Sequence, residues 1–510
     1  MRRNINIAIA VIIIGTVIAI ACNKRLNTFD QNNPTTDSYF KNVAELRNGV
    51  NAAYSSMRAG NLVGREWFFI HDMRGGETNT GGSQLEAPRA ELLTQPSPAP
   101  SNSVITSVWN GTYQMISRAN LVISRGPAIN DDPAARDVVV GEAKFLRAWA
   151  YFELVTMWGD VPLYTTPDTT TDGFKGKSPA ADIYTQIIAD LTDAAAKLPT
   201  GHSTDGRATS DAANFLLGKV LMQKGDYAGA KTALLKLYGK YKLVDNFLDN
   251  FDGDVKVGDK VVSNGPSGHE FNPESIFEVV FVDKGDNDFN WGYTGEGATA
   301  EGSIMRSQEY GIVWGNVVPS DAILNEFEPG DPRYKFTFYE SGDSILTARS
   351  TQVGKVLTEK GMNVDSSKHN GVTQRRVYRK YSILDWNDDS FHPDGINQRI
   401  MRYAEVLLML AECEAEVGSP ALAAGYINEV RTTRASVKMP PVTLTGHDDA
   451  MKAVMHERAV ELAGEEVANI DILRWRKKGY YPSLRPDPKP GQIATFPIPS
   501  SETSANPLIK

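Results

Sequence analysis

Aromatic rings and planar polar side chains gather in three stretches of this chain. These are residues 67–82 (WFFIHDMRGGETNTGG), 288–293 (DFNWGY) and 306–314 (RSQEYGIVW). Rings bury apolar area at little conformational cost, while amide, carboxylate and guanidinium groups satisfy hydroxyl groups. We interpret these stretches as loops that bind a sugar-like ligand without reacting with it. The candidate contacts are Trp67, Asp72, Arg74, Glu77, Asn79, Asn290, Trp291, Tyr293, Arg306, Tyr310 and Trp314.

For each of these rings the alternative is burial in the core, the usual place of an aromatic side chain. Of the candidates, Trp291 is the leading one, ahead of Trp67 and Trp314.

The sequence lacks the motifs of the common hydrolases and metalloenzymes. There is no His-Glu-x-x-His helix, the seven histidines are scattered, and no Gly-x-Ser-x-Gly elbow occurs. Residues 176–178 end like a phosphate loop, but Thr171 stands where its first glycine is required. Cys413 lies in an apolar helical context, and the acidic loops 249–254 and 283–288 lack calcium-loop spacing. We therefore predict no catalytic residue, no metal and no cofactor.

Composition places the chain among globular proteins and argues against nucleic-acid binding. The 510 residues are 41% hydrophobic and 23% charged, with a formal net charge of −9. Phosphate binding needs clustered Lys and Arg, and no such block occurs.

The N-terminus has the form of an export signal. Two arginines precede a 15-residue apolar run at 7–21, which is too short to span a bilayer comfortably. The run ends in Ala-Ile-Ala-Cys, which resembles a bacterial lipobox with Cys22 as the lipidated residue. The sequence thus predicts a signal peptide at 1–21 and a tether at 22–39; an ordinary secretory signal with a chance cysteine is the alternative. No later segment is apolar and long enough for a transmembrane helix.

Helical periodicity covers two blocks, about 40–240 and 397–477, separated by a loop-rich insertion at about 245–396. Residues 212–237 fit a tetratricopeptide unit: Gly218 and Ala230 allow close helix approach, and Gly225-Asp226 makes the turn with Asp226 as N-cap. Residues 404–430 repeat the design, with Glu414 where an apolar residue is expected. Further pairs are expected from 109–123, the helix after Gly141, and 179–198.

Such hairpins cannot bury their apolar faces alone, so they must stack. We predict a mostly α fold: stacked tetratricopeptide-like helical hairpins, with a long loop-rich insertion containing a few short strands, in one domain over 40–510. A generic helical bundle is the alternative.

Two segments carry a resemblance to a known family. Residues 141–164, GEAKFLRAWAYFELVTMWGDVPLY, form a helix that is apolar nearly all round and ends at Gly159 and Pro162. This sequence resembles the hallmark helix of the SusD/RagB family of outer-membrane nutrient-binding lipoproteins of Bacteroidetes.

The predicted last helix, 456–475, resembles the family's C-terminal signature, and residues 496–499 and 502–507 resemble its closing segment. The helix keeps Glu457, Arg458, Glu461, Leu462, Glu465, Asp471, Arg474 and Trp475. It departs at Glu466, where the family normally has glycine, and at Ala468, where it normally has arginine. We therefore expect one internal ion pair of the family to be missing.

The resemblance implies non-catalytic capture of a nutrient, most simply an oligosaccharide, at the cell outer membrane. It implies a lipid-anchored protein that faces outward and partners a SusC-like TonB-dependent transporter. Asn23, Lys24 and Arg25 follow the cysteine in place of the acidic residues that often accompany outward export.

Two other functions stay open at this stage. One is a glycan-degrading lipoprotein enzyme, which would release new reducing ends. The other is a repeat scaffold that binds peptides or envelope proteins, which a protein pull-down would reveal.

Overall fold

The computed structural model describes residues 39–509, except 83–84, 168–172, 252–253, 258–259, 264–268, 283–301, 303, 312–314, 344–355, 363 and 382–394. The expected signal peptide, Cys22 and most of the tether therefore lie outside the described residues. So do Asn290, Trp291, Tyr293 and Trp314.

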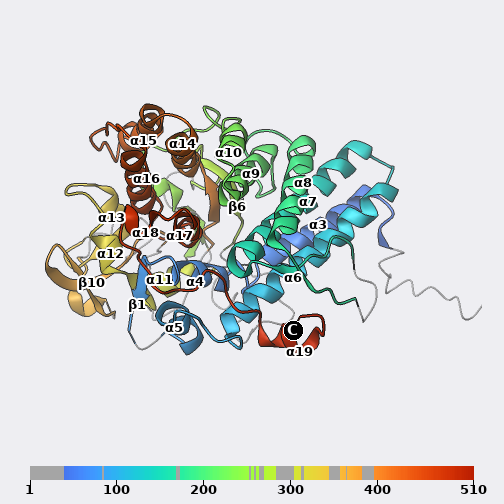
Figure 1. The fold of residues 1–510 in the computed structure, drawn as a ribbon, viewed down its shortest axis with the longest axis horizontal. Coiled ribbons are helices and arrows are strands. Elements are labelled where there is room, and N and C mark those ends of the chain that lie inside the picture. Colours follow the sequence, from blue (N-terminus) through green and yellow to red (C-terminus); the bar gives the residue numbers. More distant parts are fainter. Residues whose placement is uncertain are drawn as a thin grey trace, which may run out of the picture.

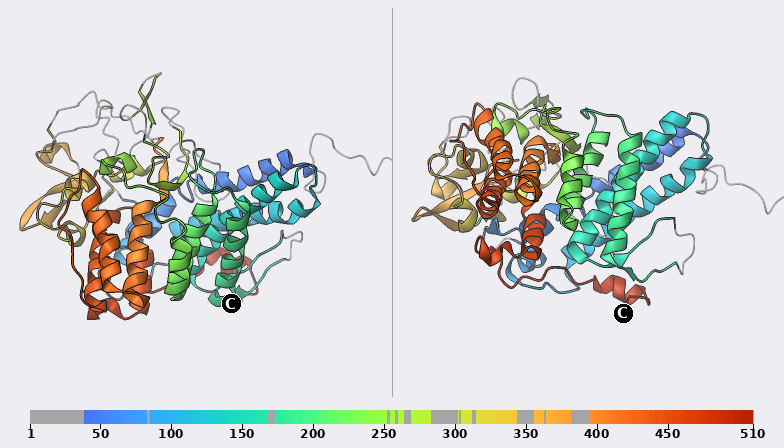
Figure 2. Two further views of the ribbon diagram at one scale, coloured as in Figure 1. Left: turned by 90° about the horizontal axis from the view of Figure 1, so that it is seen from above. Right: turned by 45° about the horizontal axis from the view of Figure 1, so that its top comes forward.

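The long helices pack one against the next in chain order, and this row forms the body of the molecule (Figure 1). Its members are α3 (Val43–Met57), α6 (Ser103–Arg125), α7 (Pro133–Trp158), α8 (Ala180–Lys197), α9 (Ser210–Lys224), α10 (Tyr227–Leu234), α14 (Tyr403–Val417), α15 (Pro420–Thr433) and α16 (His447–Leu462). Because α10 packs against α14, the helical layer continues across the insertion. Figure 2 shows the insertion to one side of this row.

The α9–α10 hairpin confirms the repeat unit expected at 212–237. Asp226 caps α10 by accepting a hydrogen bond from the Gly229 N–H, and Gly225 takes the left-handed conformation, with φ of 86°. A Cβ on Gly218 would lie 2.6 Å from Leu234 Cγ, so glycine is what lets the two helices approach.

The helix α7 is buried on nearly all faces from Val139 to Trp158, as its composition predicts. Asp132 caps its start by accepting from the Ala135 N–H, and Pro133 occupies the first turn, where no N–H is needed. Gly159, with φ of 74°, ends it.

Shorter helices connect the row to the insertion and to the C-terminus. They are α4 (Glu66–Asp72), α5 (Ala87–Thr94), α11 (Arg306–Tyr310), α12 (Asp321–Leu324), α13 (Arg333–Thr337), α17 (Ala468–Lys477), α18 (Tyr480–Ser483) and α19 (Ser500–Ala505), with 3-10 turns η1 (Gly126–Ala128), η2 (Phe247–Asn250) and η3 (Glu359–Gly361).

The strands are short and pair antiparallel in small sheets. They are β1 (Thr78–Thr80) with β7 (Val317–Pro319), β2 (Val161–Pro162) with β3 (Lys177–Ser178), β4 (Asp254–Val257) with β5 (Lys260–Ser263), β6 (Ser275–Val279) with β11 (Gln398–Arg402), and β10 (Val372–Tyr378) between β8 (Phe338–Glu340) and β9 (Ser366–His369). The predicted fold class, stacked helical hairpins with a few short strands, is confirmed.

Three local expectations were wrong. Residues 67–82 are not one loop, since α4 and β1 occupy much of the stretch, and 306–310 form α11. The predicted last helix is two helices, α16 and α17. Gly464 and Glu466 both have positive φ (69° and 60°) and break the helix between them. Two further short helices, α18 and α19, follow.

Candidate functional site

The first candidate stretch pairs with the segment that directly follows the third, through β1 and β7. Asn79 stands opposite Val318 and Thr80 opposite Val317. The Gly81 N–H continues the ladder by donating to the Asn316 carbonyl, 2.9 Å away. A Cβ on Gly81 would lie 1.5 Å from the Gly315 carbonyl oxygen, so only glycine fits there. We call this the β1–β7 edge.

Asn79 is the candidate that the described structure leaves exposed at this edge. Gly315 directly follows Trp314 in the chain, although Trp314 itself lies outside the described residues. The chain path thus joins two stretches that are more than 200 residues apart in sequence.

Trp67 is buried and bound within the helical body. Its Nε1 donates to Glu153 Oε2 at 3.0 Å, and His71 Nε2 lies 2.8 Å from the same oxygen. Glu153 belongs to α7, so these bonds fix α4 on the hallmark helix. Trp67 is therefore a core residue in this structure, which is the alternative given above for each aromatic candidate.

Asp72, Arg306 and Tyr310 form a buried polar cluster. The Tyr310 hydroxyl donates to Asp72 Oδ2 at 2.8 Å, and Arg306 Nη2 lies 3.5 Å from the same atom. Burial raises the pKa of Asp72, and the Arg306 charge and the Tyr310 hydroxyl oppose that rise. Arg306 also pairs with Glu466 and lies 4.7 Å from the centre of the Tyr310 ring.

Glu466 thus makes a buried ion pair in the segment between α16 and α17. Its positive φ of 60° is a conformation that glycine adopts more readily than glutamate. Arg74 is buried as well; its guanidinium stacks on the Phe496 ring at 4.0 Å, and burial lowers its pKa to about 9. In this structure Trp67, Asp72, Arg74, Arg306 and Tyr310 thus serve the interior and present no surface to a ligand.

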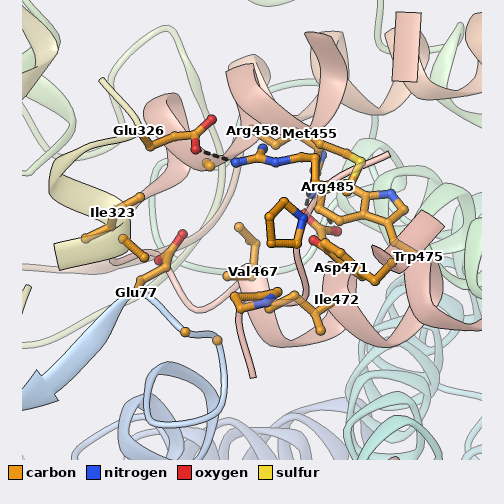
Figure 3. Close-up of a pocket in the computed structure, with 18 residues that line it drawn as sticks. Glu77, Ile323, Glu326, Met455, Arg458, Val467, Asp471, Ile472, Trp475 and Arg485 are labelled. Atoms are coloured by element: carbon orange, nitrogen blue, oxygen red, sulfur yellow. Dashed lines mark hydrogen bonds and ion pairs between the residues drawn. The ribbon is translucent and has the colours of Figure 1, made fainter. Parts of the chain in front are cut away.

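Glu77, also buried, lines a pocket that we call the C-terminal pocket (Figure 3). Its cavity volume is about 100 Å³. The turn before β1, α12, α16, α17 and the segment after α18 contribute its walls. The lining residues are Gly75, Gly76, Glu77, Ala322, Ile323, Glu326, Met455, Arg458, Ala459, Val467, Ala468, Asp471, Ile472, Trp475, Tyr481, Arg485, Pro486 and Pro488.

Four of the five charged residues in this wall pair with one another. Arg485 binds Glu326, and Arg458 Nε donates to Asp471 Oδ2 at 2.6 Å. Glu77 is the exception: its Oε2 accepts from the Gly464 N–H at 2.9 Å, and the described residues provide no ion-pair partner for its carboxyl group. Burial raises the pKa of Glu77 to about 8, and the nearby Asp72 and Asp471 add to that rise.

A second pocket, of about 230 Å³, lies between α3, residues 205–207 and β6. Its polar wall includes Asn51, Asp205 and Arg207. The guanidinium group of Arg207 already has protein partners, since it donates to Asn51 Oδ1 and Glu142 Oε2, both at 2.7 Å.

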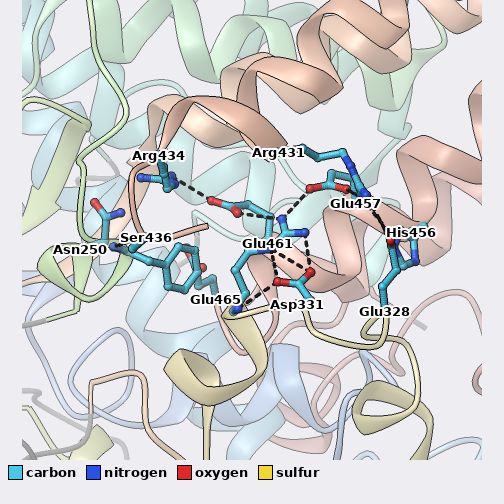
Figure 4. Close-up of polar contacts among 12 residues, drawn as sticks. Asn250, Glu328, Asp331, Arg431, Arg434, Ser436, His456, Glu457, Glu461 and Glu465 are labelled. Carbon is cyan, nitrogen blue, oxygen red and sulfur yellow. Dashed lines mark hydrogen bonds and ion pairs between the residues drawn. The ribbon is translucent and has the colours of Figure 1, made fainter. Parts of the chain in front are cut away.

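A network of buried charges holds the insertion against α16 (Figure 4). Glu461 accepts from Arg402 at 2.8 Å, from Arg434 at 2.9 Å and from Arg333 at 3.1 Å. Arg402 also binds Glu465 at 2.6 Å. The acidic residues of the C-terminal segment thus fix the fold.

Sequence reasoning missed the arginines of this network. The signal was available: Glu457 and Glu461 are four residues apart on one helix, so they share one face, and buried carboxylates require cations. Which arginines supply them depends on the path of the insertion.

Reactive centres are not evident in the described parts of the chain. Within them no group of His, Cys, Asp and Glu has the arrangement of a metal site, and no helix is long and apolar enough to cross a membrane. Cys413 is buried, and burial raises the pKa of its thiol.

Comparisons with known proteins agree over most of the chain. The model of the SusD family matches residues 273–504, and a SusD-like model described as "Starch-binding associating with outer membrane" matches residues 83–222. A SusD-like protein of Formosa agariphila is 25% identical over 452 residues, which is 86% of this chain and 85% of that protein.

Solved structures share the fold. A laminarin-binding SusD-like protein has 25% identity and a TM-score of 0.71, covering 92% of this chain and 99% of its own. A SusD superfamily protein from Bacteroides vulgatus has 22% identity, a TM-score of 0.71 and the same coverage.

Proposed function

Since this chain belongs to the SusD/RagB family, whose members associate with the outer membrane, we propose that it captures an oligosaccharide at the cell surface. The observation that carries the proposal is the relation to the laminarin-binding protein, which spans 92% of this chain. A β-linked glucan is accordingly the first ligand class to test.

The β1–β7 edge is the part of the described structure that best fits a glycan contact. Asn79 offers an exposed amide there. The hydrogen bond from Gly81 to Asn316 places this edge two residues along the chain from Trp314. The sequence-based candidates Trp291, Asn290 and Tyr293 belong to the same proposed site. Rings would stack on sugar faces, and amides would bind hydroxyl groups.

The glycan is bound and passed on without cleavage. We propose that Cys22 carries a lipid anchor, that the protein faces outward, and that a SusC-like TonB-dependent transporter accepts the ligand. Support for the non-catalytic role comes from the sequence, which lacks hydrolase motifs, and from the glycan-binding relatives.

Calorimetry with laminarin and a panel of other soluble glycans tests this function. The mature chain should bind at least one glycan, and Trp291→Ala and Asn79→Ala should each weaken binding, the ring removal by about tenfold or more. Asn130→Ala is the matched control, since Asn130 is an exposed asparagine between α6 and α7.

Two results would count against the proposal. Unchanged affinity in Trp291→Ala and Asn79→Ala would remove the β1–β7 edge as the site. New reducing ends after incubation of the purified protein with its glycan would replace capture by hydrolysis.

A further inference from the structure

Glu77 in the C-terminal pocket has a buried carboxyl group that no cation of the described residues pairs with. Glu77 is only 6% exposed. Among the described residues, the Gly464 N–H is the one donor that its carboxyl group has. Figure 3 shows this carboxyl group beside the cavity, apart from the ion pairs that surround it. A buried carboxylate needs a cation or a proton.

The neighbouring charges do not supply that cation. Asp72 and Asp471 are acidic, Arg458 is held by Asp471, and Lys380 is bound to Glu465 at 2.7 Å. Arg485, on the far wall, is bound to Glu326. The positive groups near Glu77 in the described structure are therefore already committed to other carboxylates.

The rest of the wall is mostly apolar. Ile323, Met455, Val467, Ile472 and Trp475 line the cavity, and the Trp475 N–H is already used by Glu412. A volume of about 100 Å³ is well below that of a drug-sized site and suits a compact molecule with a short hydrocarbon body.

We propose that the C-terminal pocket binds a small organic ammonium compound, whose charged nitrogen pairs with Glu77 and whose hydrocarbon part packs on the apolar wall. This site adjoins the β1–β7 edge, since Glu77 directly precedes β1, but the proposal does not depend on the proposed glycan function. It gives the protein a second ligand class besides neutral sugars.

The probe is n-butylammonium, with butyrate and n-butanol as the anionic and neutral counterparts. In calorimetry at pH 7 n-butylammonium should bind saturably and more tightly than either counterpart. Because the pKa of Glu77 is about 8 in the empty pocket, binding of the cation should release close to one proton, which titration in buffers of different ionisation enthalpy measures.

Two variants test the placement. Glu77→Gln keeps an acceptor for the Gly464 N–H but removes the charge, and should lower the affinity at least about tenfold and abolish proton release. Ala322→Trp places a ring at the exposed rim of the pocket and should block entry with Glu77 intact. Ala421→Trp, at an exposed position on α15, is its control.

The proposal is overturned if the unmodified protein binds no n-butylammonium, or if butyrate binds as well. It is equally overturned if both Glu77→Gln and Ala322→Trp keep the affinity of the unmodified protein. Glycan affinity at the β1–β7 edge should stay unchanged in Ala322→Trp, so failure at one site is distinguishable from failure at the other.

Discussion

Single residues in this chain owe their ionisation to what surrounds them. Burial alone would raise the pKa of Glu461, but the guanidinium groups of Arg434, Arg402 and Arg333 hold it well below the usual range of a glutamate. Burial likewise opposes ionisation of Glu274, yet Arg434 and Arg402 lower its pKa to about 2. Glu77 lacks such partners, and its pKa moves the other way. The difference lies in the paired cation, since all three carboxyl groups are buried.

Glu461→Gln should lower the free energy of unfolding by about 3 kcal/mol at pH 7, because three arginines lose a shared buried charge. A depressed pKa contributes stability above the unfolded-state value of about 4.5, and this stability is lost as pH falls toward the folded value. The gap between variant and unmodified protein should therefore shrink below pH ~4.5, by up to about 1.4 kcal/mol per pH unit.

Denaturant unfolding at several pH values measures that gap. Glu86→Gln, which removes a half-exposed partner of Arg65 and Arg89, is the control and should cost less than about 1 kcal/mol. A gap that stays constant from pH 7 to pH 3 would show that Glu461 is not ionised through the network.

The stability of a helix pair depends on how closely the two backbones can approach each other. In the α9–α10 hairpin the approach depends on Gly218 facing the buried Leu234. In α15, by contrast, Gly425 faces open space: apart from its chain neighbours and its own helix backbone, no atom lies within 4 Å of an added Cβ. Gly218 is thus required by packing and Gly425 is not, a difference that the local sequence of each helix does not reveal.

Gly218→Ala should destabilise the protein by about 1 kcal/mol, since overpacking against Leu234 outweighs the gain in helix propensity. Gly425→Ala should stabilise it by about 0.5–1 kcal/mol, because only the propensity changes. Thermal unfolding of the two variants side by side is the measurement. If both variants shift stability in the same direction, the close packing of α9 on α10 is not what glycine provides.

In the described residues, a row of packed helices forms the body of the molecule, and buried charges link the insertion to it. Buried ion pairs join Glu461 of α16 to Arg333 of the insertion and to Arg402 at the end of β11. Such a body can present the β1–β7 edge in a constant orientation.

The proposed lipid anchor at Cys22 can be tested directly. Cys22→Ser should move the protein from the membrane fraction to the soluble fraction, because each buried methylene of an acyl chain contributes about 0.8 kcal/mol to membrane attachment. Metabolic labelling with palmitate should mark the unmodified protein and Cys413→Ala, but not Cys22→Ser. Retention of Cys22→Ser on membranes after cleavage of the signal would contradict the anchor.

Local pattern in the sequence was enough for most of the long helices, the turn at Gly225-Asp226, the end of α7 at Gly159 and the family. These features follow from residues within a few positions of one another, where periodicity, caps and backbone freedom act directly. The sequence likewise excluded the common reactive motifs.

Only the tertiary structure decided which candidate side chains face solvent. Trp67 and Arg306 look like loop residues in sequence, but their partners Glu153 and Glu466 lie 86 and 160 residues away, so no local window contains the pair. The same long-range path places Asn79 opposite Val318, leaves Glu77 without a cation among the described residues and gives Glu461 three. Contacts of this kind depend on how distant segments close into one core, and local periodicity carries no information about that closure.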